Sequence, residues 1–341
     1  LVRIKATGVC HSDLNCARGL SRGTMPLILG HEASGVVERV GSSVSRVKPG
    51  DRVILSWAPA CGHCFYCHEQ HPALCDSYNY AAGQGGLWDG TSRLKRAAKP
   101  QETINHFSCV SSFAEYAVVP ETGCIPMHEE IPFAVGALVG CAVTTGFGAV
   151  VNDAKVRAGD CVAVIGVGGV GVNAIQAAAI NGAETIVAID VNDEKRAVAE
   201  KFGATHFFNP KTGDAAEYLR GLSHGRGADS AIECTGRPPA LTMAYNLVRP
   251  GGTLVVVGIA AFGEQFTVAA STLPNSQRKI IGSNYGGGVP EEDIQRILSL
   301  YRKGRFDIDS QIGERIRLEQ VNEAFDRLEQ GVLARSIIEF A

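Results

Sequence analysis

Four cysteines stand close together in the stretch CGHCFYCHEQHPALC: Cys61, Cys64, Cys67 and Cys75. Four thiolates from a short piece of chain complete the tetrahedral coordination of zinc and leave no open position for a substrate. This spacing therefore predicts a structural zinc site in a lobe over residues 61–75. An iron–sulfur cluster or a loop with redox cysteine pairs also uses CxxCxxC spacing, but nothing nearby indicates electron transfer.

Three more potential metal ligands lie far apart in the sequence: Cys10 in GVCHSD, His31 in GHEASG and Cys141 in GCAVTTGFG. Alone, a cysteine is most often a small buried apolar side chain, and a histidine most often a polar side chain with satisfied hydrogen bonds. The three residues indicate a metal site only in combination with the cysteine lobe and with a nucleotide-binding sheet domain.

A glycine motif opens the most regular part of the chain, with Gly166, Gly168 and Gly171 directly after the apolar run CVAVI and at the start of a helical pattern. Glycines let the backbone approach a pyrophosphate, and the helix N-terminus supplies N–H donors to it. Asp190 ends the next apolar run, where a carboxylate accepts hydrogen bonds from ribose hydroxyls and repels a 2'-phosphate. The motif therefore predicts a dinucleotide site that takes NAD rather than NADP.

The elements around these motifs fall into two domains. Residues 143–284 alternate six apolar runs with helical patterns, which predicts a doubly wound parallel sheet with helices on both faces. Residues 1–142 show short strands broken by glycine and proline, without helical periodicity, and indicate an irregular β-rich domain. After residue 284 we expect a helix entered at Pro290, a second helical pattern over 319–331 and a closing strand, and we expect residues 285–341 to return to the first domain.

Composition narrows the functional class. A chain of 341 residues favours two domains, and a formal charge of −3 without a basic block argues against nucleic-acid binding. We find no apolar run of about eighteen residues and no secretory signal, so we expect no membrane segment and a cytoplasmic location. The eleven cysteines are odd in number and clustered, which favours metal binding over disulfides. The chain opens on an apparent strand, LVRIKATGVC, which suggests that one or two strands precede it.

Together the motifs GVCHSD, GHEASG, the cysteine lobe, DGTSRL, GCAVTTGFGA, GVGGVG and VAID resemble the zinc-dependent medium-chain alcohol dehydrogenases, especially the dimeric liver-type and class III-like members. The resemblance runs from Cys10 to the C-terminus. It implies an α/β fold, with a Rossmann doubly wound parallel sheet plus an irregular β-rich GroES-like catalytic domain. It further implies that Cys10, His31 and Cys141 bind a catalytic zinc, the second zinc of the chain, and that NAD is the hydride acceptor.

The same resemblance implies roles near the catalytic zinc. Asp13 would orient His31, Glu32 would lie near the metal, and Ser12 would take the proton of the alcohol. Asn15 departs from the family, because many relatives carry a histidine there that passes the proton on, and an amide cannot act as a base near neutral pH.

Further contacts follow from the resemblance alone. Cofactor contacts are implied for His11, Thr145, Gly169, Val170, Lys195 and Arg335. Substrate contacts are implied for Trp57, Phe107, Ser108 and Ile259. Each of these residues could also have an ordinary structural role. A single arginine such as Arg335 is often a solvated surface residue, and residues like those of the pocket often belong to the hydrophobic core.

The sequence thus predicts an NAD-dependent zinc alcohol dehydrogenase that converts a primary, apolar or aromatic alcohol to the aldehyde. One alternative is a thiol-adduct formaldehyde dehydrogenase of the glutathione or mycothiol type. The glutathione enzymes carry an acid after the first motif and an arginine after the lobe, where this chain has ARGLSRG and Tyr78. Another alternative, a non-catalytic zinc-stabilised nucleotide-binding protein, would be expected to lack a zinc ligand or the Ser12 hydroxyl. The long connection from Cys75 to Cys141 resembles dimeric relatives, so we expect a homodimer through the edge strand KIIGS.

Overall fold

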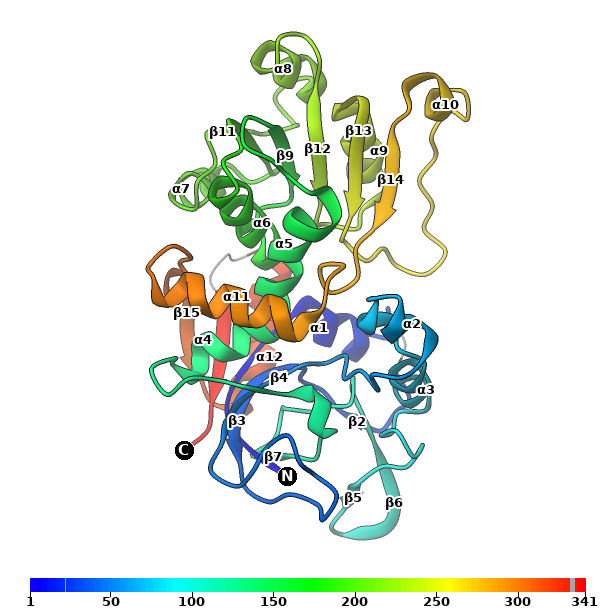
Figure 1. Ribbon diagram of the computed structural model, residues 1–341, viewed down its shortest axis with the longest axis vertical. Helices are drawn as coiled ribbons and strands as arrows, with labels where there is room; N and C mark the ends of the chain where they lie inside the picture. Colours follow the sequence, from blue (N-terminus) through cyan, green and yellow to red (C-terminus); the bar gives the residue numbers. More distant parts are fainter. Residues whose placement is uncertain (22, 332–334) are drawn as a thin grey trace. The chain divides into compact units, whose positions relative to one another are not determined.

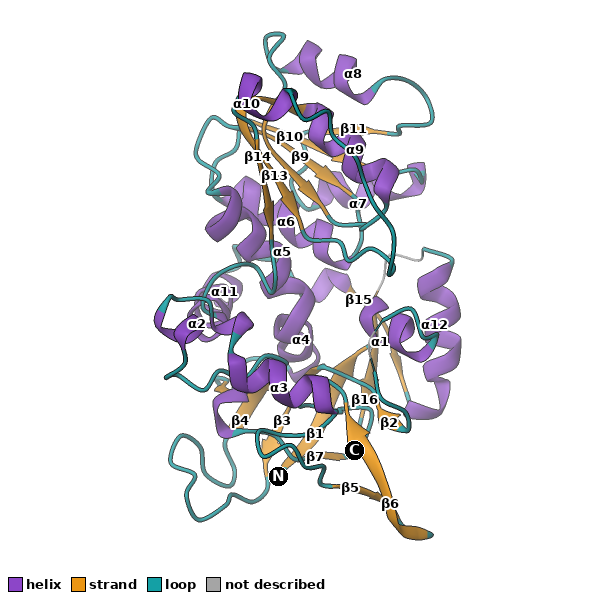
Figure 2. Cartoon of the chain, turned by 90° about the vertical axis from the view of Figure 1, so that its right-hand side faces the viewer, coloured by secondary structure: helices purple, strands orange, loops and turns teal. Residues whose placement is uncertain are grey.

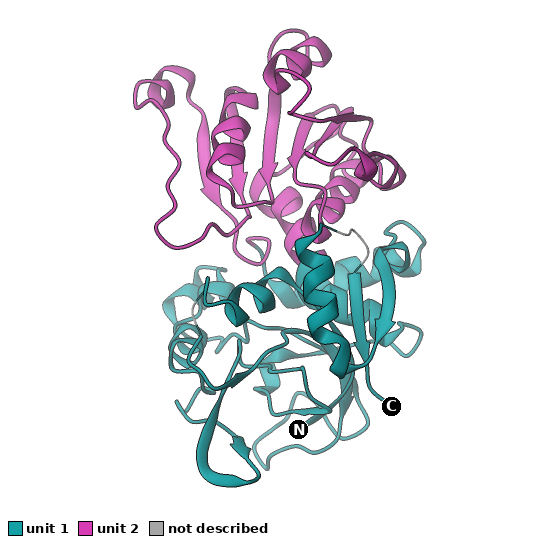
Figure 3. Ribbon diagram, turned by 180° about the vertical axis from the view of Figure 1, so that it is seen from behind, with its two compact units in different colours: residues 1–142, 288–341 teal, residues 143–287 magenta. Residues whose placement is uncertain are grey.

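The computed structural model describes residues 1–21, 23–331 and 335–341. The chain divides into two compact units (Figure 3): unit 1 comprises Leu1–Ala142 and Gly288–Ala341, and unit 2 comprises Val143–Gly287. The chain returns to unit 1 after Gly287, a few residues later than the expected boundary at residue 284. The loop before this boundary packs within unit 2, where Asn152 Nδ2 donates to the Gly286 carbonyl at 2.9 Å.

Unit 1 is built on a seven-stranded sheet in the order β15-β16-β1-β3-β4-β8, with β7 also paired to β1. Its strands are β1 (Val2–Gly8), β3 (Glu32–Val37), β4 (Arg52–Leu55), β7 (Tyr116–Ala117), β8 (Cys124–Pro126), β15 (Ile312–Ile316) and β16 (Arg335–Glu339). The C-terminal strand β16 runs antiparallel to the N-terminal strand β1, with Gly8 opposite Ile337. The C-terminal segment therefore returns to unit 1.

Apolar side chains from β1, β3 and β4 form the core beneath this sheet, among them Val2, Ala33 and Val53. A smaller sheet, β2-β6-β5, joins β2 (Leu27–Ile28), β5 (Leu94–Arg96) and β6 (Lys99–His106). Unit 1 also contains helices: α1 (His11–Ala17), α2 (Phe65–His68), α3 (Asp76–Gln84), α4 (Phe133–Leu138), α11 (Pro290–Arg302) and α12 (Val321–Glu329). Helices α1 to α4 lie before residue 142, where the sequence showed no helical periodicity, because each of them is too short to show a repeating apolar face.

Unit 2 contains a six-stranded sheet in the order β11-β10-β9-β12-β13-β14, in which every pair of neighbours is parallel. Its strands are β9 (Cys161–Ile165), β10 (Thr185–Ile189), β11 (His206–Phe208), β12 (Ala228–Glu233), β13 (Val248–Val256) and β14 (Lys279–Gly282). Figure 2 shows helices on both sides of these strands. They are α6 (Gly169–Ile180), α7 (Arg196–Lys201), α8 (Ala215–Leu222) and α9 (Pro238–Leu247), with α10 (Thr272–Ser276) before β14 (Figure 1).

This strand order reverses beside β9, which is the arrangement of the Rossmann fold and places a ligand site at the carboxyl ends of the central strands. All five residues of β9 are buried, as expected for a parallel strand covered on both faces. The α/β fold class with a doubly wound sheet is confirmed.

One helical run, residues 133–154, corrects another expectation. It begins with α4, continues through α5 (Thr144–Gly148) and includes two π-helical turns, Val139–Val143 and Ala149–Ala154. Within the described residues it is long and apolar enough to cross a membrane by length and composition, although we expected no such run. Its most apolar stretch is 83% buried inside the structure, as for a core helix.

Candidate metal sites and nucleotide site

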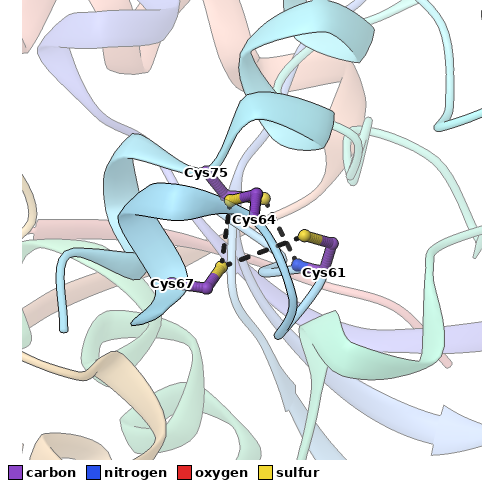
Figure 4. A group of neighbouring side chains, drawn as sticks. All are labelled: Cys61, Cys64, Cys67 and Cys75. Atoms are coloured by element: carbon purple, nitrogen blue, oxygen red, sulfur yellow. Dashed lines mark hydrogen bonds between the residues drawn. The ribbon is translucent and has the colours of Figure 1, made fainter. Parts of the chain in front are cut away.

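The sulfur atoms of Cys61, Cys64, Cys67 and Cys75 face one another in the lobe (Figure 4). The Cys67 sulfur lies 3.5 Å from that of Cys64 and 4.0 Å from that of Cys61. Tetrahedral zinc with bonds of about 2.3 Å to sulfur separates its ligands by about 3.8 Å, so this donor set fits zinc. None of the eleven cysteines is in a disulfide.

Backbone N–H groups donate hydrogen bonds to these sulfurs and favour the thiolate form, which binds a cation. The Cys61 N–H donates to the Cys75 sulfur at 3.3 Å. Burial raises the pKa of Cys61, but hydrogen bonds from the backbone of His63 and Cys64 outweigh it and lower the pKa to about 6. A thiolate at Cys61 near neutral pH is the form that binds metal.

A second group brings together Cys10, His31, Glu32 and Cys141, whose candidate ligand atoms all lie within 4.8 Å of one another. Cys10 caps the N-terminus of α1, Glu32 opens β3, and Cys141 lies in the π-helical turn Val139–Val143. π-Helical turns frequently occur at functional sites, since the extra residue redirects a side chain from the regular helix surface. Two sulfurs and one imidazole nitrogen form a donor set that fits a catalytic zinc with an open fourth position.

The position of His31 depends on Gly30 before it. Gly30 has φ +94°, and a side chain there would lie 2.5 Å from the Phe113 backbone nitrogen. Only glycine allows this close approach without strain, and the approach places His31 at the start of β3.

Asp13 lies beneath the group with no exposed surface. Its Oδ1 lies 3.1 Å from His31 Nδ1 and accepts a hydrogen bond from the Gly30 N–H at 2.9 Å. Its Oδ2 accepts from the Cys10 N–H at 3.2 Å, which also caps α1. With Nδ1 turned to this carboxylate, His31 keeps Nε2 for a metal.

The electrostatics of the group also suit a cation. A hydrogen bond from Cys141, together with His31, lowers the pKa of Cys10 well below its usual range. Burial raises the pKa of Glu32, although Arg335 opposes this. Arg335 pairs with Glu32 Oε2 and donates to the Val9 carbonyl at 3.1 Å, while Glu32 Oε1 is buried with no hydrogen-bond partner. A buried, unpaired carboxylate oxygen beside two sulfurs is the kind of atom that a bound cation would satisfy.

Other predicted residues lie around this group in unit 1. Ser12 is half-buried in the first turn of α1, and His11 is exposed beside it. The Phe107 ring meets the His31 ring edge-on, with centroids 5.6 Å apart. Arg335, predicted to contact pyrophosphate, is 6% exposed, so it is not a solvated surface arginine.

The predicted pocket residues are divided between the two units. Trp57 packs edge-on against Tyr78, and Ser108 follows Phe107 in a loop. Ile259 belongs to unit 2, where it is 75% exposed. Sequence reasoning treated Tyr78 only as a departure from relatives, and no local pattern indicates its packing in this region.

The glycine motif of unit 2 has the geometry of a nucleotide loop. A side chain on Gly171 would lie 1.8 Å from the Gly166 carbonyl oxygen, whereas one on Gly168 would meet nothing within 4 Å. Gly168 caps α6, and Gly169 is its first residue. The open space at this helix N-terminus fits a pyrophosphate.

Asp190 lies just beyond β10 and is held in place by its neighbours. Its Oδ2 accepts from the Val167 N–H at 2.8 Å and lies 3.0 Å from Lys195 Nζ, and its Oδ1 accepts from the Asn192 N–H at 3.1 Å. Thr145 and Val170 lie on the adjoining helices α5 and α6, which approach closely because Gly146 has no side chain.

A doubly wound sheet with a nucleotide loop, combined with a cysteine lobe and a second cluster of metal-type ligands, defines a metal-dependent dehydrogenase. Comparison with known proteins agrees. The model of the alcohol dehydrogenase GroES-like domain matches residues 1–129, and that of zinc-binding dehydrogenases matches residues 169–303.

Relatives match over nearly the whole chain. A probable S-(hydroxymethyl)glutathione dehydrogenase of Schizosaccharomyces pombe is 36% identical, over 99% of this chain and 89% of its own length. A class-3 alcohol dehydrogenase of Cereibacter sphaeroides is 37% identical, over 100% of this chain and 92% of its own length. The structure of benzyl alcohol dehydrogenase from Acinetobacter calcoaceticus matches with a TM-score of 0.93 at 30% identity, covering 100% of this chain and 91% of the other.

The chain therefore belongs to the zinc-dependent alcohol dehydrogenase family. It is an oxidoreductase whose cofactors are zinc and NAD.

Proposed function

We propose that this enzyme oxidises the primary alcohol group of a hydroxymethyl thiol adduct, R–S–CH₂OH, with NAD as hydride acceptor. The name of the Schizosaccharomyces pombe relative supports this substrate class, which the sequence analysis held only as an alternative. The observation that carries the chemistry is the cluster of Cys10, His31 and Cys141 above Asp13. The Phe107 ring beside His31 suits a thioether, because sulfur packs favourably against ring edges.

In the proposed mechanism, Cys10, His31 and Cys141 hold the catalytic zinc, and Cys61, Cys64, Cys67 and Cys75 hold the structural one. Zinc in the first site supplies Lewis acidity that lowers the pKa of the alcohol. Asp13 holds the tautomer and orientation of His31.

The Ser12 hydroxyl would accept the proton of the alcohol O–H group. NAD, when bound, would supply the acceptor for the hydride of the alcohol carbon. Gly166, Gly168, Gly169 and Gly171 hold the pyrophosphate, and Asp190 with Lys195 binds the adenosine ribose. His11, Thr145, Val170 and Arg335 are proposed as further cofactor contacts.

A second substrate class, apolar or aromatic primary alcohols, rests on a different observation. Phe107 contacts His31, and Trp57 packs against Tyr78 in the same unit. The solved relative that acts on benzyl alcohol belongs to this class by name. Tyr78 also stands where the glutathione enzymes were expected to carry an arginine.

One assay separates the two classes. NADH formation from formaldehyde is measured with and without glutathione, and kcat/KM is compared with that for benzyl alcohol. We expect turnover that requires the thiol and a higher kcat/KM for the adduct. Thiol-independent turnover with benzyl alcohol as the better substrate would establish the second class and reject the first.

We also propose a homodimer through β14, since this edge strand of the unit 2 sheet has a partner strand on one side only. Light scattering of the purified protein would give twice the mass of 36.0 kDa. The cytoplasmic location stays a prediction.

A further inference from the structure

Two buried hydroxyl groups of unit 1 hydrogen-bond each other on segments that adjoin the proposed zinc ligands. Thr7 Oγ1 and Ser112 Oγ lie 2.7 Å apart, and both residues are fully buried. Neither residue is among the proposed metal ligands, cofactor contacts or relay groups. A buried hydroxyl that loses its partner is costly, so each of the two groups fixes the position of the other.

The two hydroxyls belong to distant parts of the chain. Thr7 is the second-last residue of β1, and Cys10 follows three residues later, where it caps α1. Thr7 also lies opposite Ala33 in β3, two residues after His31. Ser112 lies in the segment that follows β6. The hydrogen bond therefore ties the strand that leads to one zinc ligand to a separate segment of unit 1.

That segment turns sharply before it reaches Ser112. Ser108, Cys109 and Ser111 have φ angles of +52°, +57° and +58°, which residues other than glycine rarely adopt. The Phe107 N–H donates to Ser111 Oγ at 2.9 Å and closes the turn. Backbone in this region of φ persists only where the surrounding structure holds it. The contacts of Ser112 at the end of the turn supply part of that support.

Beyond the turn, the segment holds the backbone directly before His31. The Ser112 N–H donates to the Gly30 carbonyl, and the Phe113 N–H donates to the Leu29 carbonyl, both at 2.9 Å. A side chain on Gly30 would lie 2.6 Å from Ser112 Oγ, so this hydroxyl packs directly against Gly30. Ser112 thus contacts the residue before a zinc ligand through both its backbone and its side chain.

Gly30 is held from the other side as well. Its N–H donates to Asp13 Oδ1 at 2.9 Å, and the same oxygen lies 3.1 Å from His31 Nδ1. Both backbone polar groups of Gly30 are therefore bonded, one to Asp13 and one to Ser112. Because His31 follows directly, a shift of Ser112 would change the direction from which the imidazole approaches a metal.

We propose that Thr7 and Ser112 are positioning residues for the catalytic zinc site. Their hydrogen bond fixes the distance between two pieces of backbone: the strand that leads to Cys10 and the turn at Gly30 that places His31. Asp13 orients the imidazole ring, and the hydroxyl pair positions the backbone that carries it. This inference rests on the catalytic zinc site of the proposed function.

The test compares Thr7→Val with wild type, Thr7→Ser and Thr272→Val. Valine keeps the shape of threonine without its hydroxyl, whereas serine keeps the hydroxyl. Thr272, in α10 of unit 2, is a matched control because its hydroxyl also lies 2.7 Å from another hydroxyl, that of Tyr245. Zinc release from the holoenzyme to a coloured chelator is followed over time, and the phase absent from Cys141→Ser is assigned to the catalytic site.

We expect Thr7→Val to speed the release of catalytic zinc about tenfold, the lower end of the range for loss of a group that orients a metal ligand. Thr7→Ser and Thr272→Val should release this zinc at the wild-type rate. The phase of the cysteine lobe should be unchanged in all three variants. With cobalt in the catalytic site, the ligand-field bands should shift in Thr7→Val and stay unchanged in Thr7→Ser and Thr272→Val.

Ser112→Ala removes the same hydrogen bond from the other side and tests the inference even if Thr7→Val folds poorly. It should also speed the release of catalytic zinc and shift the cobalt bands. The double variant of Thr7→Val and Ser112→Ala should release zinc no faster than the faster single variant, since only one bond is lost.

Release rates and cobalt bands equal to wild type in Thr7→Val and Ser112→Ala would overturn the inference, as would effects that multiply in the double variant. A lower Tm with unchanged cobalt bands would assign the pair to the stability of the sheet alone and would overturn it too. A wild-type protein that holds only one zinc would instead overturn the proposed function, and this inference with it.

Discussion

Asn15 lies one turn after Ser12 in α1, and both side chains are half-buried. Residues three apart on a helix share a face, so a group at position 15 is placed to receive a proton from position 12. An amide has no usable basicity near neutral pH, so in the proposed relay we expect water to carry the proton onward.

We accordingly predict that Ser12→Ala lowers kcat by about a hundredfold, as for loss of a positioned proton-transfer group. Asn15→Ala should be nearly silent and serves as the control. Asn15→His adds a base with a pKa near 6.5 and should raise kcat around neutral pH, where that base is largely unprotonated and can accept the proton. The measurements are pH profiles of kcat. Near-full activity of Ser12→Ala across the pH range would reject the relay.

Asp190 is the residue that we propose favours NAD over NADP. Its carboxylate is already oriented by the Val167 and Asn192 N–H groups. We predict that Asp190→Gly raises KM for NAD at least tenfold while KM for NADP changes little, because the ribose contact is lost and repulsion of a 2'-phosphate is removed. Steady-state kinetics with both cofactors checks this, and a native enzyme that already prefers NADP contradicts it.

At the scale of single residues, the sequence indicates those residues whose type alone suits them to bind a metal. The seven candidate zinc ligands stand in recognisable motifs, and the structure brings them into two groups. The positive φ angles of Ser108 and Cys109 were not predictable, because such an angle leaves no mark on residue type and depends on contacts made far along the chain.

At the scale of elements, the turn from β9 into α6 has two glycines with opposite surroundings. Gly171 faces the Gly166 carbonyl oxygen, whereas the space beside Gly168 is open. Gly171 is needed for the packing of the protein itself, and Gly168 leaves room for a ligand.

We therefore predict different defects for two alanine substitutions. Gly171→Ala should lower the free energy of unfolding by about 3 kcal/mol, as for a severe overpacked contact. Gly168→Ala should leave stability within about 1 kcal/mol of wild type and raise KM for NAD. Chemical denaturation and cofactor kinetics separate these outcomes, and equal loss of stability in both variants would contradict the assignment of open space to the nucleotide.

The elements of unit 2 were predictable because parallel strands are continuously apolar and alternate with helices. In unit 1 the same reasoning missed α1, α3 and α4. The α3 sequence DSYNYAAGQ mixes polar and small residues, and its two buried residues, Tyr78 and Ala81, do not form an amphipathic repeat.

On the scale of the whole molecule, we expect the two groups of metal ligands to have separate roles: the cysteine lobe stabilises the fold, and the group of Cys10, His31 and Cys141 serves catalysis. The lobe sulfurs come from one segment, 61–75, whereas the catalytic ligands come from three. We predict that Cys75→Ser loses one zinc and lowers Tm, and that Cys141→Ser loses the other, keeps a near-native Tm and abolishes turnover. Elemental analysis and thermal unfolding give both readouts. A single zinc in the wild-type protein would contradict the scheme.

The pairing of β16 with β1 bears on how a newly made chain matures. Unit 2 is one continuous segment, whereas the central sheet of unit 1 includes β16, which follows unit 2 in the sequence. Because domains generally fold as units during synthesis, we expect the sheet of unit 1 to be completed after unit 2 has been made. Arg335, the partner of Glu32, is in that strand, so the charge beneath the catalytic ligands remains uncompensated during synthesis. Strand β16 follows every candidate metal ligand in the sequence, so a polypeptide interrupted before this strand retains its cysteine and histidine ligands without the complete sheet beside them.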